Sequence, residues 1–221
     1  GIANDLSFDR DISTIPIKAF CGCSQIKSVI FPNEITEISA AAFYECKGLG
    51  SIKLPTQLST LGVYAFYGCS NMKGDLIIPN GLGTISSYAF YDCSSLDGKL
   101  EIGDSVKTIG SYAFCRCGFT GDLIISQVTK IDEGAFLECS NFNGKLDLIN
   151  ITIGYLSLGN RAFEGCSKIC GPIDINAIKS IGERAFSGCS SLTGQLNFYS
   201  DVDTINKYIF NGCSSLTGPI N

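Results

Sequence analysis

Histidine and tryptophan are missing from this chain of 221 residues, and methionine occurs only once. The lack of histidine excludes Ser–His–Asp and Cys–His catalysis, histidine-ligated zinc and the HExxH peptidase motif. No stretch approaches the ~18 consecutive apolar residues of a membrane span. Positive charge is also scarce, with 16 Lys and Arg against 21 Asp and Glu. This balance argues against a non-specific nucleic-acid binder, which needs clustered positive charge.

Catalytic and cofactor-binding motifs are missing as well. No GxGxxG, P-loop, GxSxG or EF-hand pattern occurs. The carboxylates Asp132 and Glu133 occupy a repeat position that other units fill with Gly-Ser, Ser-Ser or Asn-Lys, which favours a solvated loop. We therefore predict that the chain is not an enzyme and that it binds no cofactor and no metal.

A repeat runs through the whole sequence instead. An Ala-Phe pair, once Ile-Phe, recurs at intervals of 22–27 residues, and a cysteine follows each phenylalanine after three residues. The nine phenylalanines are Phe20, Phe43, Phe66, Phe90, Phe114, Phe136, Phe163, Phe186 and Phe210. The nine cysteines are Cys23, Cys46, Cys69, Cys93, Cys117, Cys139, Cys166, Cys189 and Cys213. Such a period is the signature of a repeat architecture.

Each unit carries two further apolar elements in fixed register. An aliphatic residue stands five positions before each phenylalanine, as Ile85 does before Phe90. After the cysteine comes an apolar–x–apolar triplet, such as Leu76 to Ile78 or Ile173 to Ile175, which predicts a short strand with alternate side chains inward. The segment from the aliphatic residue to the cysteine has the spacing of a helical or 3-10 turn.

One such unit cannot bury its apolar side alone, whereas stacked units can. We therefore predict an α/β leucine-rich-repeat solenoid of about nine repeats. Short parallel strands would line one face, and helical or 3-10 turns would form the convex side. We expect residues 1–221 to be one domain, uncapped at both ends and a fragment of a longer chain. Residues 1–30 lack the pattern of a secretion signal, so we expect any such signal to have been removed.

The unit resembles the BspA-like leucine-rich repeat, with its LxIPxxxxxIgxxAFxxCxxL consensus. The segments VKTIGSYAFCRC (106–117) and IKSIGERAFSGCSSLTG (178–194) carry this resemblance most closely. It implies a cell-surface or secreted protein that adheres to a host matrix or cell-surface protein. Repeats of this kind are defined by core positions, so the resemblance is specific for fold and weakly specific for function.

The nine repeated cysteines form one column along the predicted solenoid. A buried cysteine behaves as a small hydrophobe with a weak S–H donor, and we predict reduced structural thiols. Disulfides between neighbouring units and a metal or redox ladder are the alternatives. Cys21, Cys115 and Cys170 lie off the column. Because twelve free thiols suit an oxidising exterior poorly, a cytoplasmic location stays open beside the surface or secreted one.

Two surfaces are candidates for binding a partner. On the strand face, the residues between the inward triplet positions include Lys53, Glu101, Asp147, Asp174 and Asn197, and a merely solvated surface is the alternative reading. Two tyrosine columns flank the phenylalanines, because tyrosine stands two residues before the phenylalanine in three consecutive units and one residue after it in three overlapping units. These tyrosines are Tyr64, Tyr88 and Tyr112, and Tyr44, Tyr67 and Tyr91. Tyrosine is enriched at interfaces, although the columns could equally serve packing alone.

One unit is longer than the others, with its extra residues inside 149–157, which we expect to form a surface bulge or a contact loop. The same segment holds the only N-glycosylation sequon, Asn150-Ile151-Thr152. The sequence thus favours a non-enzymatic macromolecule-binding module. Three alternatives stay open: a structural spacer that presents a neighbouring domain, an intracellular leucine-rich-repeat scaffold, and an enzyme whose catalytic domain lies outside these residues.

Overall fold

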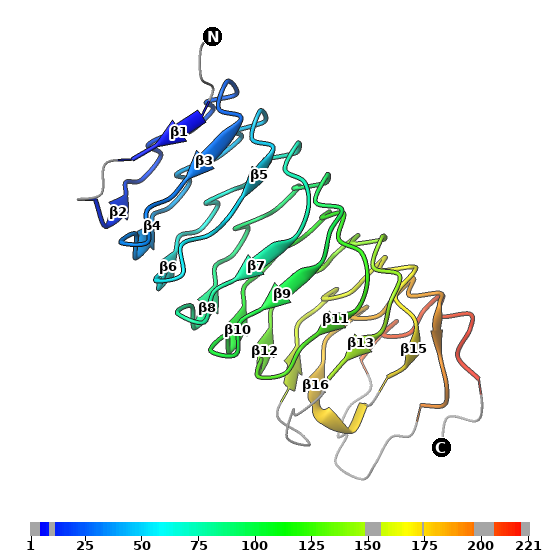
Figure 1. Cartoon of the computed structure of the whole chain (residues 1–221). Helices are drawn as coiled ribbons and strands as arrows, with labels where there is room; N and C mark the ends of the chain where they lie inside the picture. Colours follow the sequence, from blue (N-terminus) through cyan, green and yellow to red (C-terminus); the bar gives the residue numbers. More distant parts are fainter. Residues whose placement is uncertain (1–4, 9–11, 149–155, 174, 197–205, 218–221) are drawn as a thin grey trace.

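The chain winds into a solenoid whose coils stack along one axis. A computed structural model describes residues 5–8, 12–148, 156–173, 175–196 and 206–217. Figure 1 shows the coils as successive layers from β1 (Asp5–Ser7) to the last coils, so that the first and the last described coils lie at opposite ends of the stack. The solenoid prediction and its parallel strands are confirmed.

The predicted triplet strands form the first ladder. They pair in parallel with register offsets equal to the repeat, as in Leu76↔Leu100 and Ile78↔Ile102. The inward residues Leu76 and Ile78 are buried, whereas Ile77 between them is exposed. The strands after β1 are β3 (Ser28–Ile30), β5 (Ser51–Ile52), β7 (Leu76–Ile78), β9 (Leu100–Ile102), β11 (Leu123–Ile124), β13 (Leu146–Asp147), β15 (Gly171–Pro172) and β17 (Leu192–Thr193). In the last two, the strand precedes the predicted triplet.

A second parallel ladder lies where the sequence predicted a helical turn. The aliphatic residue five positions before each phenylalanine belongs to it, and Ile85 and Ile109 pair across β8 and β10. Its strands are β2 (Thr14–Ile15), β4 (Glu37–Ile38), β6 (Thr60–Leu61), β8 (Thr84–Ile85), β10 (Thr108–Ile109), β12 (Lys130–Ile131), β14 (Leu156–Leu158) and β16 (Ile178–Ile181). Within the described residues the one helical element is the 3-10 helix η1 (Ile175–Ala177).

The Ala-Phe segment forms overlapping β-turns and not a helix. In the third unit the Tyr67 N–H donates to Tyr64 O at 3.2 Å, and the Cys69 N–H donates to Phe66 O at 3.3 Å. The intervening N–H groups point along the solenoid, so that Phe66 donates to Ala89 O of the next coil at 2.8 Å. Since an α-helix needs every N–H for its own i−4 carbonyl, this alternation excludes one. The predicted α/β class and helical convex side are therefore wrong.

Two positions of the turn require positive φ, which sequence reasoning did not detect. The residues two before and two after each phenylalanine are left-handed in all nine units, with φ between 52° and 78°. All twelve non-glycine residues with positive φ in the described chain stand at these two positions, among them Tyr64, Tyr88 and Tyr112. A side chain there costs about 1–2 kcal/mol of backbone strain. The stacked coils hold the strained turns in place through the bonds between coils.

Replacing Gly188 with alanine is expected to lower the free energy of unfolding by about 1 kcal/mol, because its φ is +77° while its Cβ would make only an ordinary van der Waals contact, 3.6 Å from the backbone of Gly165. Urea unfolding followed by circular dichroism measures the loss. Gly83→Ala is the matched control, since nothing lies within 4 Å of its Cβ direction and its φ is not positive. Equal effects of the two substitutions would contradict a left-handed requirement at residue 188.

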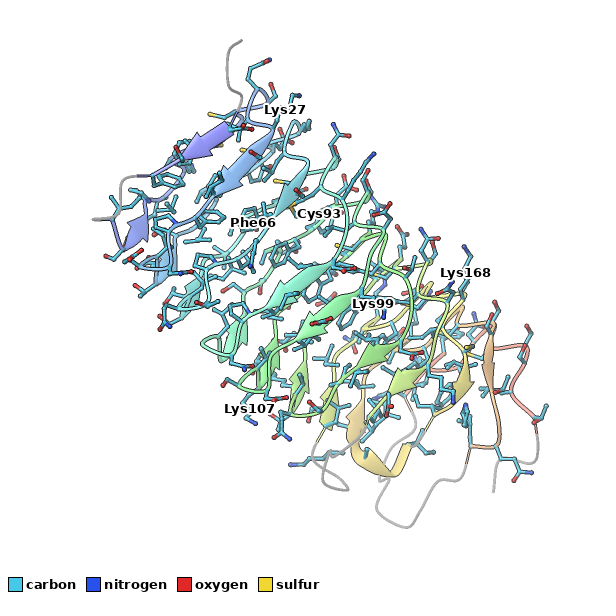
Figure 2. The ribbon with its side chains drawn as sticks, viewed as in Figure 1. Lys27, Phe66, Cys93, Lys99, Lys107 and Lys168 are labelled. Atoms are coloured by element: carbon cyan, nitrogen blue, oxygen red, sulfur yellow. The ribbon has the colours of Figure 1, made fainter. Side chains whose placement is uncertain are left out.

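The phenylalanines of the nine turns form one continuous stack in the core. Successive ring centroids are 5.2–5.5 Å apart, and neighbouring planes differ by at most 18°. In Figure 2, Phe66 and Cys93 lie within the stack of coils, while Lys27, Lys107 and Lys168 lie at its outline. The shared interior predicted from the repeat is confirmed.

The cysteine column is bonded to this stack. Each column thiol from Cys46 to Cys213 is buried and donates its S–H to the carbonyl oxygen of the phenylalanine one coil back, at 2.9–3.2 Å. The same carbonyl also accepts the N–H of the cysteine in its own coil, as Phe66 O does from Cys69. Each thiol therefore fills a small apolar volume and also gives the phenylalanine carbonyl oxygen a second hydrogen-bond donor. The prediction of buried structural thiols is confirmed for these eight cysteines.

Candidate functional site

The strand face presents apolar and charged side chains in alternation. Ile30, Ile77 and Ile124 are 65%, 55% and 52% exposed, which is high for isoleucine. Lys53 and Glu101 are exposed on the coils between them, and Ile77 pairs directly with Glu101 in the β7–β9 register. The sequence already contained this order, but it was interpreted as a mixed and unpatterned face.

A shallow depression of about 640 Å³ lies on this face across β5, β7 and β9. Lys53, Ile77 and Glu101 line it together with Asp75 and Asp104. The Asp75 carboxylate accepts the backbone N–H of Lys99 at 2.7 Å, so this acid also ties two coils together. The structure thus brings two of the predicted strand-face residues into one hollow.

The other strand-face candidates are placed differently. Asp147 lies in β13, half-buried, and pairs with Ile124 of β11. Asp174 and Asn197 lie outside the described residues, as do the sequon at 150–152 and most of the predicted surface bulge. Of the strand-face candidates, Lys53, Glu101 and Asp147 therefore lie in or next to strands of the first ladder.

The six tyrosines form two stacked ladders side by side. Tyr44, Tyr67 and Tyr91 stack at 4.8 Å between ring centroids, with planes 3° apart. The second ladder is Tyr64, Tyr88 and Tyr112, which stack at 5.0 and 5.1 Å with planes 18° apart. The residues of the second ladder all have a left-handed backbone, and their rings lie beside those of the first ladder.

Contacts between the ladders make them one aromatic surface. Tyr64 meets Tyr67 edge to face at 5.8 Å, and Tyr88 lies 5.7 Å from Tyr91. Tyr64 is 38% exposed, and the other five rings are half-buried. The rings thus pack on one another and also reach solvent. We call these six residues the tyrosine patch.

The tyrosine patch ends in a hydrogen bond. The Tyr112 hydroxyl donates to Glu133 Oε1 at 2.7 Å, and this bond, with desolvation, raises the pKa of Tyr112 to about 12. Desolvation also raises the pKa of Tyr67, Tyr88 and Tyr91 above the ordinary tyrosine value. These four phenols therefore stay neutral at physiological pH.

Beyond the tyrosine patch, the same side of the solenoid becomes ionic. Arg116 Nε contacts Glu138 Oε2 at 2.7 Å, and Arg161 Nε contacts Glu164 Oε2 at 2.6 Å. Arg184 lies over the Tyr208 ring at 5.0 Å. Sequence reasoning missed this change from aromatic to ionic character, although the residue types at the two turn positions signal it.

The off-column cysteines do not come together. Cys21 is exposed, Cys170 is half-buried, and Cys115 is buried beside the tyrosine patch. Burial raises the pKa of Cys115 to about 12, so this thiol stays protonated. Across the described residues, no group of three or more Cys, Asp or Glu has the arrangement of a metal site.

The repeat pattern identifies the family. The sequence profile of the BspA type leucine rich repeat region matches residues 3–120, 74–169 and 142–218. The chain belongs to the BspA-type leucine-rich repeat family. The family resemblance drawn from the Ala-Phe and cysteine spacing is therefore confirmed, and it extends over nearly the whole sequence.

Solved structures share the BspA-type fold. A leucine-rich repeat protein from Bacteroides ovatus ATCC 8483 is 22% identical and superposes with a TM-score of 0.52 over 96% of this chain and 71% of its own. A leucine-rich repeat protein from T. pallidum is 24% identical, with a TM-score of 0.63 over 87% of this chain and 79% of its own. A comparison with curated proteins finds no significant match. At these identities the likeness shows the fold alone.

The family assignment indicates a protein-interaction repeat module. BspA-type repeats are generally non-enzymatic, and leucine-rich repeats generally bind proteins. In the described part of the chain, no helix has the length and hydropathy needed to cross a bilayer. Among the described residues, the tyrosine patch and part of the strand face contain the side chains that the sequence analysis selected as candidates for contact with a partner.

Proposed function

We propose that this chain is a non-enzymatic binding module of a cell-surface or secreted protein, and that it adheres to a host matrix or cell-surface protein. Residues 1–221 would act as one solenoid domain. The family supports a protein-binding role. The resemblance of the repeats to those of BspA-like surface proteins supports the proposed surface location.

The tyrosine patch is the observation that carries this proposal. Rings stacked at 4.8–5.1 Å along two ladders are held rigid before any partner arrives. Ordering of interface side chains costs about 0.5–1.5 kcal/mol per flexible side chain, so a rigid surface binds with less loss. Tyrosine also combines a large apolar area with a polar tip, which suits protein interfaces.

The double variant Tyr67→Ser/Tyr91→Ser is expected to weaken adhesion at least about tenfold, because truncating interface tyrosines costs over ~1 kcal/mol each. Surface plasmon resonance on immobilised matrix and cell-surface proteins measures the dissociation constant. The matched control is Lys53→Ser/Glu101→Ser on the strand face, which we expect to leave binding unchanged.

Two results would contradict the proposal. If the unaltered chain bound no protein of the panel, the adhesive role would be wrong. If the strand-face control lost as much binding as the tyrosine variant, the tyrosine patch would not be the contact surface. Circular dichroism of all variants separates lost binding from lost folding.

A further inference from the structure

Both tyrosine ladders begin abruptly, and a hollow lies where they begin. The coil before Tyr44 has Cys21 at the equivalent position, and the coil before Tyr64 has Ala41. Neither residue carries a ring, so the first ring of each ladder has a stacking partner on one side only. The resulting depression is about 530 Å³ and is lined by Lys18, Cys21, Ala41, Tyr44, Tyr64, Tyr67 and Tyr88.

The two first rings form a corner in this hollow. Tyr44 and Tyr64 meet at 6.4 Å between centroids, with their planes 66° apart. Each ring is supported from behind by the next ring of its ladder, Tyr67 at 4.8 Å and Tyr88 at 5.0 Å. A flat apolar group entering the corner would therefore stack on one ring and meet the edge of the other, the two arrangements that aromatic pairs prefer.

Lys18 is the one charged residue among the described residues that line the hollow. Lys18 is exposed at the hollow and makes no salt bridge within the described part of the chain. Glu45 does not line the hollow, and its carboxylate contacts Lys47 Nζ at 3.6 Å. An ammonium beside aromatic faces disfavours a cationic ligand and favours a carboxylate next to the apolar group.

Ala41 is the residue that creates the hollow. Its φ is +54°, close to the 56–60° of Tyr64, Tyr88 and Tyr112, so its backbone is shaped as theirs is. A tyrosine in its place would extend the second ladder by one ring. The chain therefore lacks a ring at a position whose backbone accepts one.

We propose that this hollow binds an aromatic side chain of the protein partner that stands next to a carboxylate. The ring would enter the corner between Tyr44 and Tyr64, and the carboxylate would pair with Lys18. This inference rests on the proposed function, because it names the segment of the partner that the N-terminal end of the tyrosine patch recognises.

The absence of tryptophan from the chain makes a direct test straightforward. The probe is the peptide acetyl-Gly-Asp-Trp-Gly-amide, whose tryptophan can be excited where tyrosine does not absorb. We expect saturable quenching or a blue shift of its emission, with a dissociation constant of about 0.1–1 mM. The peptide with Lys in place of Asp is expected to bind at least about tenfold more weakly.

Three variants locate the site. Ala41→Tyr is expected to abolish probe binding while the chain stays folded, because it fills the hollow with a residue that the next three coils already accept. Lys18→Glu is expected to weaken the Asp-Trp probe at least about tenfold and to remove its advantage over the Lys-Trp probe. Lys27→Glu makes the same charge change as Lys18→Glu at an exposed residue that does not line the hollow, and it is the matched control with unchanged binding.

The following results would overturn the inference: no binding up to about 5 mM, equal binding of the two peptides, or full binding to Ala41→Tyr. Binding of an acidic monosaccharide with displacement of the probe would assign the hollow to glycans and also overturn it. The inference can fail alone, because adhesion to a protein and binding of the probe peptide are separate measurements, although Tyr67 lines the hollow behind Tyr44. If the variant Tyr67→Ser/Tyr91→Ser loses adhesion while the probe never binds, the proposed function stands without this ligand.

Discussion

Raising the pH from 8 to about 10.5 is expected to unfold this solenoid in one steep transition, under reducing conditions. Burial raises the pKa of eight buried thiols above their ordinary value of 9.0. For Cys46 and Cys115 the pKa rises to about 12, and for Cys213 to about 11. The others are Cys69, Cys117, Cys139, Cys166 and Cys189.

The direction of the effect follows from which state keeps its protons. Below pH 9.0, the ordinary thiol pKa, folded and unfolded chains both hold protonated thiols, and the stability is fully present. Above it the unfolded chain loses protons that the folded chain retains, so stability falls as the pH rises toward the folded pKa values. Well above pH 9.0 each thiol contributes at most about 1.4 kcal/mol per pH unit, so eight contribute at most about 11. A typical stability of about 5–15 kcal/mol is then lost within one or two pH units.

Urea unfolding at a series of pH values from 8 to 10 measures this slope, which becomes steeper above pH 9.0. The variant Cys139→Ala/Cys166→Ala removes two of the eight thiols, and the slope should fall by about a quarter although the variant is less stable at every pH. A free energy of unfolding that stays constant up to pH 11 would contradict the account of the cysteine column.

Replacing Phe90 with alanine is expected to lower the free energy of unfolding by about 3–5 kcal/mol. Its ring is fully buried and lies 5.4 Å from Phe66 and 5.5 Å from Phe114, so the truncation leaves a cavity in mid-stack. In a solenoid each coil contacts only its neighbours, so the same cavity should weaken the coupling between the two halves. Urea titration followed by circular dichroism should show a lower midpoint and a broader transition.

Phe20→Ala is the matched control for this substitution. Phe20 has the same place in the first repeat but is only half-buried, with a stacked neighbour on one side at 5.2 Å. We expect it to cost about 1–2 kcal/mol, because less apolar surface is lost from the core. If both substitutions cost the same, the phenylalanines would act one by one and not as a continuous stack.

The core could be predicted from sequence because each coil repeats one pattern of inward side chains. The period placed the phenylalanines and thiols in columns, and the triplets gave the first ladder in β3 to β13. The second ladder was missed because Thr84-Ile85 and its equivalents are too short to show the alternation of a strand. The helical turn was wrong because the direction of alternate N–H groups is decided by the next coil.

The binding surfaces were predicted less completely. The tyrosine columns followed from register, and so did the exposed line from Lys53 to Glu101. The hollow at Ala41 was missed, because a gap in a column becomes a site only when rings and charges around it are fixed in space. Lys18 was not a candidate from sequence, because only the structure places it beside the open ring faces of Tyr44 and Tyr64.

The sequence by itself determined the solenoid, its period, its columns of phenylalanine and cysteine, and its family. The reason is that every coil buries an apolar side, so the same apolar residues recur in every repeat. Only the tertiary structure decided the left-handed turns, the thiol bonds to the preceding coil and the corner between Tyr44 and Tyr64. These features depend on hydrogen bonds and ring contacts between residues at least 20 positions apart, such as the Cys46–Phe20 bond. A single repeat does not contain such contacts, since they form only when coils stack.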